Sequence, residues 1–259
     1  MSLLVWIIIF SLLGGVLSVI AASSFLLLPK NIRAILIPHF VSFAIGALLG
    51  AAFLALIPHS LMGTYKIEVH HLGLTILLGL LGFFIMEKLV IWRHCHSDHC
   101  EAHPDHIEHS DKAAGTLVLI GDGMHNFIDG ILIAAAFMTD FHLGIVTSVA
   151  VATHEIPQEV GDFAVLLNSG FSRRKALLFN ILASLTTVVG ALLAYYSLSN
   201  LQAIVPYVLA VAASSFIYIA VADLIPGLHK RTQLSAGIQQ MLLISAGIIV
   251  IYLAHSQLH

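Results

Sequence analysis

The chain has 259 residues, of which 59% are hydrophobic and only 10% are charged, and its mean hydropathy is +0.97. A soluble globular domain carries roughly 25% charged and about 45–50% apolar residues, so this composition excludes a soluble enzyme and a disordered chain. The same arithmetic excludes a nucleic-acid-binding protein, which would need a basic surface, and the formal net charge is −3.

Eight long apolar runs predict an all-α polytopic membrane protein, in which residues 1–259 form a single transmembrane domain. Each run can cross the hydrocarbon core as an α-helix, which takes about 20 residues. The first run is too long for the apolar core of a cleaved signal peptide, so we expect it to be retained. The runs cover residues 3–28, 34–58, 72–92, 114–138, 143–169, 176–198, 203–228 and 236–254.

Lysine and arginine residues concentrate in the connections on one side of the predicted membrane. The opposite side has Lys66 alone, and Lys88 lies near the end of the third run. Because these residues favour the cytoplasmic side, both termini are expected outside the cytoplasm, in a plasma membrane or a bacterial inner membrane. The bases on the first side are Lys30, Arg33, Arg93, Lys112, Arg173, Arg174, Lys175, Lys230 and Arg231.

A short internal match suggests inverted repeats. The second run ends in Leu56-Ile57-Pro58 and the seventh contains Leu224-Ile225-Pro226, and these two helices are expected to point in opposite directions. An inverted repeat of runs one to three with runs six to eight would produce this match, as in many transporters. We therefore predict a 3+2+3 arrangement of the eight helices.

The connection between the third and fourth runs, residues 94–113, is rich in histidine and contains both cysteines, Cys95 and Cys100. The predicted topology places it in the reducing cytosol, where a structural disulfide is not expected. We interpret the tract as binding metal weakly at several points, to receive or sense ions; a solvated linker is the alternative. Its histidines and acids are His94, His96, Asp98, His99, Glu101, His103, Asp105, His106, Glu108, His109 and Asp111.

Seven of the 14 acids lie inside the predicted helices, where Lys88 is the only base. A charge at the centre of a membrane helix costs about 2.5–3.5 kcal/mol, so the five carboxylates of the fourth and fifth runs would cost on the order of 10–15 kcal/mol if left unpaired. Neither run contains a base, which leaves protonation, a water-filled cavity or a bound cation as compensation. The seven acids are Glu87, Asp122, Asp129, Glu155, Glu159, Asp162 and Asp223.

The polar side chains of the fourth and fifth runs gather on one face of each helix, within arcs of roughly 100° and 140°. The four-residue connection from Thr139 to His142 makes the two helices antiparallel neighbours, so the faces are expected to meet at the bilayer midplane. The faces consist of Asp122, His125, Asn126 and Asp129 on the fourth run and of His154, Glu155, Gln158, Glu159 and Asp162 on the fifth.

Imidazole, carboxylate and amide oxygen atoms in one place form a ligand set for a divalent transition metal. Without thiolate, and with only two imidazoles, such a site suits an ion that is bound and then released. Pro157 has no N–H for the carbonyl of Thr153, which would leave a backbone oxygen free beside the ligands. A purely structural role and a proton pathway without metal are the alternative interpretations.

The segments 125–130 and 154–162, His-Asn-Phe-Ile-Asp-Gly and His-Glu-Ile-Pro-Gln-Glu-Val-Gly-Asp, resemble the paired signature of the ZIP (Zrt/Irt-like protein) metal-ion transporters. The resemblance extends along the whole chain, including eight helices and a His-rich cytosolic loop. It implies transport of zinc, or variously of iron, manganese or cadmium, toward the cytoplasm as substrate and not as cofactor. It also implies an elevator-like or rocking movement of the site-bearing helices.

The resemblance further implies a site, often binuclear, between the fourth and fifth helices, with Asp129 bridging the two positions. Gln158 departs from the family pattern, which usually has His or Glu there, and its neutral amide removes one strong ligand. Ala51 and Ala55 stand where similar proteins often carry Asp and His, so the outer access route is expected to be sparser. The implied ligands are His125, Asp129, His154 and Gln158 at one position and Asn126, Asp129, Glu155 and Gln158 at the other.

The main alternative function is a membrane-embedded zinc hydrolase. The segment from His154 to Gln158 begins like the His-Glu-x-x-His helix of metalloproteases, but it ends in Gln and contains Pro157. A proton-coupled carrier of an organic substrate is a third class, disfavoured because the two polar helices hold no base for an anionic group. The expected partners are divalent metal ions and the lipid bilayer, with a homodimer left open and no nucleic acid.

Overall fold

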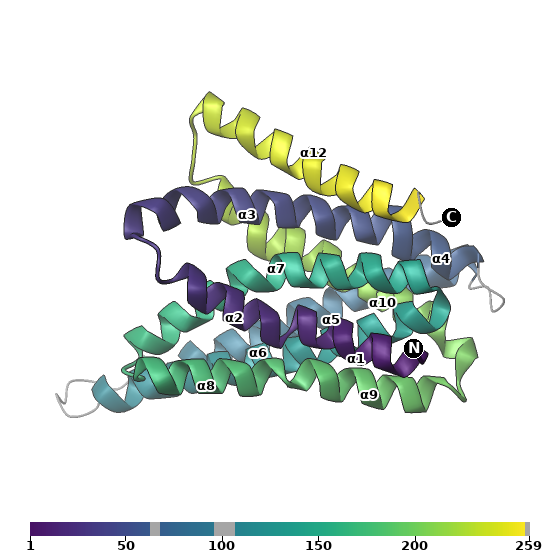
Figure 1. The fold of residues 1–259 in the computed structure, drawn as a ribbon, viewed down its shortest axis with the longest axis horizontal. Coiled ribbons are helices and arrows are strands. Elements are labelled where there is room, and N and C mark those ends of the chain that lie inside the picture. The colour runs from purple at the N-terminus through teal and green to yellow at the C-terminus, as the bar shows by residue number, and fades with distance from the viewer. Residues whose placement is uncertain (63–67, 96–106, 257–259) are drawn as a thin grey trace.

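The computed structural model describes residues 1–62, 68–95 and 107–256, with side chains described outside residues 89–114. These residues form helices and no strand (Figure 1). The first predicted run corresponds to α1 (Leu3–Gly14) and α2 (Val16–Phe25), and the second corresponds to α3 (Lys30–Gly50), η1 (Ala51–Leu56) and α4 (Ile57–Met62). The third, fourth and fifth runs correspond to α5 (Val69–Cys95), α6 (Ile107–Thr139) and α7 (Phe141–Asn168). The sixth run corresponds to α8 (Arg173–Ser184) and α9 (Thr186–Leu198). The seventh corresponds to η3 (Gln202–Ile204), α10 (Val205–Tyr218), η4 (Ile219–Leu224) and α11 (Ile225–Leu228), and the eighth corresponds to α12 (Leu234–Ser256).

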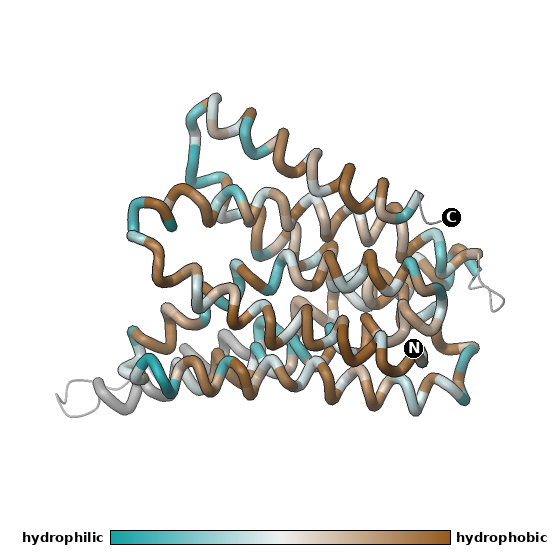
Figure 2. Tube along the Cα trace, in the orientation of Figure 1, coloured by the Kyte–Doolittle hydropathy of each residue, from teal (hydrophilic) through white to brown (hydrophobic). Residues whose placement is uncertain are grey.

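Seven helical segments of the described chain are long and apolar enough to cross a membrane. The remaining long helix, α7, has 28 residues and is not among them, because its polar face lowers its hydropathy. The all-helical prediction is therefore confirmed, with seven or eight helices of membrane-spanning character. Figure 2 shows hydrophobic residues along the helices and hydrophilic residues gathered at the turns.

Two helices extend further than the apolar runs that predicted them. α5 continues to Cys95 and α6 begins at Ile107, so both ends of the predicted loop 94–113 are helical. Hydropathy marks the thickness of the bilayer, and a helix does not have to end where the bilayer ends. The central part of the predicted metal-binding tract, residues 96–106, lies outside the described residues.

The first and sixth apolar runs are each broken in the middle, although the sequence predicted continuous helices. The breaks fall at Gly15, whose φ is −88° and ψ is −91°, and at Leu185. They touch each other: a Cβ atom on Gly15 would lie 2.6 Å from the carbonyl oxygen of Ser184. Only a glycine permits this approach of the two backbones.

Helices α3 and α10 each widen into a π-helix, η1 and η4, which ends at the leucine of the Leu-Ile-Pro match noted in the sequence. Because Pro58 and Pro226 lack an N–H, the regular hydrogen-bond pattern cannot continue through them, and a wider turn accommodates the mismatch. The neighbours also correspond, since α12 packs on α3 and α5 packs on α10.

Helices α6 and α7 lie at the centre of the bundle, with α9 packed on α6 and with α1, α2 and α3 packed on α7. Both termini lie at one end of the bundle, and the connections from α2 to α3, α7 to α8 and α11 to α12 lie at the opposite end (Figure 1). We call this second end the basic end, because its described connections and the first turns of the helices that follow them carry Lys30, Arg33, Arg173, Arg174, Lys175, Lys230 and Arg231.

Candidate metal centre

The turn between α6 and α7 sets the geometry of the site. Only Asp140 separates the two helices, and its Oδ1 atom accepts hydrogen bonds from the backbone N–H groups of His142 at 2.9 Å and Leu143 at 3.0 Å. Burial acts to raise the pKa of Asp140, but these two hydrogen bonds, together with the nearby imidazoles of His142 and His59, outweigh it and hold the pKa below its usual value. This capped turn folds α7 back along α6 and brings the two polar faces together, as the sequence predicted.

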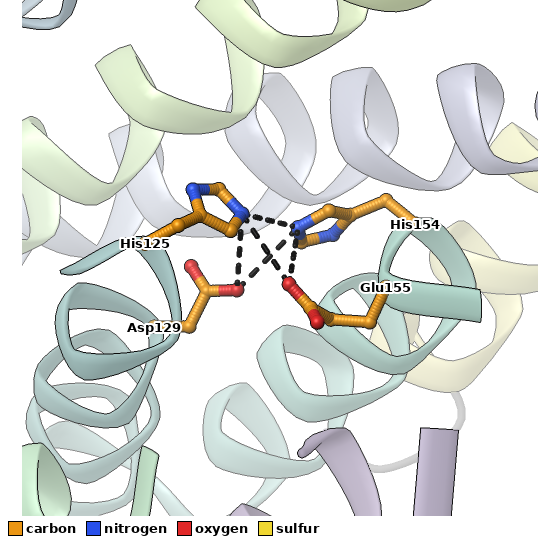
Figure 3. Close-up of side chains that lie close together, drawn as sticks. All are labelled: His125, Asp129, His154 and Glu155. Carbon is orange, nitrogen blue, oxygen red and sulfur yellow. Dashed lines mark hydrogen bonds and ion pairs between the residues drawn. The ribbon is translucent and has the colours of Figure 1, made fainter. Parts of the chain in front are cut away.

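Four side chains converge where the polar faces meet: His125 and Asp129 of α6, and His154 and Glu155 of α7 (Figure 3). One ligand atom from each lies within 4.8 Å of all the others. The Nε2 atoms of the two histidines are 3.1 Å apart, and their distances to the carboxylate oxygens of Asp129 and Glu155 range from 3.4 to 3.7 Å. Tetrahedral zinc with bonds of about 2.0–2.1 Å separates its ligand atoms by about 3.3 Å, so these distances already approach those of a zinc site.

The imidazole of His154 is oriented by its own helix. Its Nδ1 atom lies 3.1 Å from the carbonyl oxygen of Ala150, which accepts the Nδ1 proton and turns Nε2 toward the cluster. A backbone carbonyl on the outer nitrogen is the usual partner of a metal-ligating histidine, because it selects the tautomer and holds the ring. The ring also contacts Phe216 of α10 edge-on, at a centroid distance of 6.2 Å.

A second group lies beside the first and consists of Asp122, Glu155 and Glu159, all buried. Glu155 belongs to both groups: its Oε1 atom approaches the two histidines, and its Oε2 atom lies 3.4 Å from Nδ2 of Asn126. The same nitrogen donates to Oδ1 of Asp122 at 2.8 Å. The structure thus juxtaposes two candidate cation positions about one shared carboxylate.

Most of the carboxylate oxygens in these two groups are buried without a hydrogen-bond donor in the described chain. This holds for both oxygens of Asp129, both of Glu159, Oε1 of Glu155 and Oδ2 of Asp122. Buried carboxylates in native proteins are almost always paired, hydrogen-bonded or bound to a metal. The two histidines approach carboxylate oxygens of Asp129 and Glu155 at 3.4–3.7 Å, whereas both oxygens of Glu159 have no hydrogen-bond partner in the described chain. A bound cation is one partner that would satisfy both groups.

A cavity of about 430 Å³ adjoins the cluster and reaches His125, whose side chain is 15% exposed. Gln158 and Asp162, the two remaining residues of the predicted site, lie half-buried in its wall. The sequence did not predict the opposite wall, where the hydroxyl of Tyr218 on α10 donates to Oε2 of Glu87 on α5, near Asp223. The two acids were visible as intramembrane charges, whereas nothing in the sequence marked Tyr218.

The structure therefore brings together seven of the nine predicted residues and places the other two in the adjoining cavity. The seven are Asp122, His125, Asn126, Asp129, His154, Glu155 and Glu159. Thr187 of α9 is a further contact of the site that sequence reasoning missed, since its Oγ1 atom donates to Oδ1 of Asn126 at 2.8 Å. A threonine in an apolar helix carries no signal that would identify it beforehand.

Comparison with known proteins gives a consistent result. A family model described as ZIP Zinc transporter matches residues 92–255. The chain is 32% identical over 227 residues to Zinc transporter ZIP13 of Pongo abelii, which covers 83% of this chain and 66% of that protein. It is 30% identical over 258 residues to Zinc transporter ZIP13 of Homo sapiens, covering 83% and 70%. It is also 40% identical over 114 residues to Zinc transporter ZIP4 of Homo sapiens, covering 44% and 18%. The chain thus spans about two thirds of the length of these ZIP13 relatives.

Proposed function

The chain belongs to the ZIP zinc transporter family, and from this we propose that it carries divalent transition-metal ions, zinc foremost, into the cytoplasm through the cluster between α6 and α7. The observation that carries the proposal is the set of buried carboxylate oxygens on these helices that have no hydrogen-bond donor in the described chain. The metal is the transported substrate in this proposal and not a resident cofactor. Iron, manganese and cadmium share some of the ligand preferences of zinc and are the alternative substrates.

The charge of the site supports a cation as the substrate. Five acids from α6 and α7 line the cluster and its cavity, and neither helix carries a base between residues 115 and 168. Such acids cost about 2.5–3.5 kcal/mol each at the bilayer centre when they are ionised and unpaired. A divalent ion removes much of that cost while it is bound, and the lack of thiolate ligands keeps its release feasible.

We infer two adjacent ion positions that share Glu155. The first comprises His125, Asp129, His154 and Glu155, and the second comprises Glu155, Glu159 and Asp122 with Asn126. The resemblance to the family assigns the bridging role to Asp129, whereas the residue common to both groups in this structure is Glu155. Gln158 lies in the cavity wall, where we propose that its amide oxygen contacts the ion on its way in or out.

The proposed direction rests on the distribution of charge and space. The basic end is the cytoplasmic side under the positive-inside tendency, which puts both termini outside, in a plasma or bacterial inner membrane. The cavity lies toward this end, because α7 runs to the basic end and Pro157, Gln158 and Asp162 follow His154 along it. On the other side of the cluster, Leu132 to Phe137 of α6 are buried in a packed core. The arrangement suits a site open to the cytoplasm.

We propose that transport moves one set of helices against another. α1, α2 and α6 to α9 pack chiefly on one another, and α3 to α5 pack chiefly on α10 to α12. The paired breaks of the first and sixth runs and the paired π-helices support the predicted 3+2+3 inverted repeat. A repeat of this kind gives two related conformations, in which the site faces opposite sides of the membrane.

The membrane-embedded zinc hydrolase gains no support from the relatives, which are named as zinc transporters. The test that separates the two functions is zinc flux into proteoliposomes of the purified chain, with and without a proton gradient. We expect saturable zinc entry that is abolished by Glu155→Gln. Absence of flux from well-inserted protein, under either condition, would contradict the proposal.

A further inference from the structure

The side-chain amide of Asn126 is held at both ends. Its Nδ2 atom donates to Oδ1 of Asp122 at 2.8 Å and lies 3.4 Å from Oε2 of Glu155, while its Oδ1 atom accepts from Thr187 Oγ1 at 2.8 Å. All four residues are buried. Two carboxylates accept hydrogen bonds and donate none when ionised, so the nitrogen end of the amide has to face them.

Thr187 reaches Asn126 because α6 and α9 are in backbone contact. A Cβ atom on Gly130 would lie 1.8 Å from the carbonyl oxygen of Thr187, and one on Gly190 would lie 2.0 Å from that of Phe127. The hydroxyl of Thr187 also lies against the break in the first run, since a Cβ atom on Gly15 would be 2.9 Å from Oγ1. Glycines on α6, on α9 and at the break of the first run thus hold the threonine hydroxyl beside the amide.

This orientation of the amide conflicts with a cation at the second position. A divalent ion held by Asp122 and Glu155 would meet Nδ2, which carries the positive end of the amide dipole, in place of the oxygen that metals prefer. Rotation of the amide about its last bond would turn Oδ1 toward the ion and Nδ2 toward Thr187. A hydroxyl group can donate or accept, so the same threonine can satisfy both orientations.

We propose that Thr187 is a positioning residue that supports two orientations of the Asn126 amide, one with Nδ2 toward the carboxylates and one with Oδ1 toward a bound divalent cation. In the absence of the ion, the amide nitrogen donates hydrogen bonds to the carboxylates of Asp122 and Glu155 and so limits the repulsion between them. The ion takes over this role when it binds. This inference rests on the proposed function, because it assumes that the second group receives a cation. It adds a residue from outside α6 and α7 to the control of the site.

The neighbouring threonine provides a matched control. Thr186 lies on the same helix, and its hydroxyl donates to the carbonyl oxygens of Gly123 and Ala183, each at 2.6 Å. Those acceptors belong to the backbone and not to the cluster. Thr186→Val and Thr187→Val therefore remove the same group from adjacent positions, and only the second touches Asn126.

The test is equilibrium zinc binding to the purified chain in detergent, by isothermal titration calorimetry. We expect Thr187→Val to weaken binding about three- to tenfold, the size of one neutral hydrogen bond. Both states lose a hydrogen bond, but not an equivalent one. The free amide loses the donor to Oδ1 and keeps the carboxylate contacts of Nδ2, whereas the ion-bound amide loses the acceptor of Nδ2, and a buried N–H left without an acceptor is the less tolerated of the two. Thr187→Ser should bind like the unaltered chain, and Thr186→Val should change affinity by less than about twofold. If valine prevents folding, Thr187→Ala removes the same hydroxyl in less space.

A double-mutant cycle shows whether Thr187 acts through Asn126. In an Asn126→Ala background, the effect of Thr187→Val should shrink to less than about twofold, because the amide is gone. An undiminished effect in that background, or equal behaviour of Thr187→Val and Thr186→Val, overturns the proposal. Loss of zinc binding in Glu155→Gln with unchanged binding in Thr187→Val refutes this inference alone. Unchanged binding in Glu155→Gln refutes the proposed function itself.

Discussion

The Nε2 atoms of His125 and His154 lie 3.1 Å apart across the interface of α6 and α7, with their rings edge-to-face at a centroid distance of 5.4 Å. Two ring nitrogens at this distance can share a proton or a cation, but they cannot both direct N–H groups at each other. Asp129 and Glu155 lie within 3.7 Å of this pair. The four side chains therefore lie within contact distance of one another, and we expect the loss of any one to change the surroundings of the other three.

Removing one buried charge from this unit should abolish transport. We expect Asp129→Asn and Glu155→Gln each to reduce zinc uptake into cells or proteoliposomes at least about a hundredfold, because an amide replaces a charged ligand at nearly unchanged volume. The amount of protein in the membrane should stay the same, since neither carboxylate forms an ion pair with a lysine or arginine in the described chain and each amide can still contact the neighbouring histidines. Radioactive zinc uptake normalised to membrane protein measures the effect.

Glu68→Gln serves as the control for these variants. Glu68 lies at an exposed position before α5, where its partner is His71 at 3.8 Å and both side chains are more than half exposed. An exposed pair of this kind contributes little to stability. Uptake should therefore remain unchanged in Glu68→Gln, and normal uptake in both site variants would refute the proposed ligands.

Gln158 should tune the choice of metal. It lies in the cavity wall with His125 and Asp162, and the neutral amide there binds a transition metal more weakly than an imidazole would. Gln158→His is expected to strengthen zinc binding or to shift the order among zinc, cadmium, iron and manganese. Competition of each metal against radioactive zinc gives that order, and an order identical to that of the unaltered chain would show that position 158 does not contact the ion.

The composition and the unpaired acids were enough to predict the membrane helices and most of the side chains that the structure brings together between α6 and α7. Intramembrane carboxylates are costly, so their positions on one face of two adjacent helices restrict what can compensate them. The sequence did not predict which carboxylate belongs to both groups of candidate ligands, Glu155 or Asp129. Which one is shared depends on side-chain rotamers at Glu155 and Asp129, and both residues fall on the faces that the helical period predicts.

The helix breaks could not be predicted, because their cause is tertiary. Gly15 lies in an uninterrupted apolar run, and Leu185 is a good helix former, so neither position changes the hydropathy. The breaks arise where the two runs touch at Gly15 and Ser184. Thr187 was missed for the same reason, since its contact with Asn126 exists only once α9 packs on α6.

The contact between α6 and α9 should tolerate no added methyl group. We expect Gly130→Ala to destabilise the chain by about 1–3 kcal/mol, because the new Cβ atom would meet the backbone of Thr187 and not a flexible side chain. At about 2–4 °C per kcal/mol, the midpoint of thermal unfolding in detergent should fall by several degrees.

Gly161→Ala is the matched control on the adjacent helix. A Cβ atom on Gly161 would meet nothing within 4 Å, and alanine is the better helix former, so its unfolding midpoint should stay the same or rise. Equal midpoints for the two variants would show that α6 and α9 can separate without cost. In that event the close approach would not explain how Thr187 is held beside Asn126.

The cavity should be accessible from the cytoplasm alone. Val41 of α3 lies in its wall, whereas Ala135 of α6 is fully buried on the other side of the cluster. In a background with Cys95→Ser and Cys100→Ser, a membrane-impermeant thiol reagent should label Val41→Cys in inside-out vesicles and spare it in intact cells. Zinc should slow this labelling, because the ion occupies the same space, and Ala135→Cys should react from neither side. Labelling of Val41→Cys in intact cells would reverse the proposed orientation, since a reagent outside the cell reaches the cavity only if the basic end faces outward.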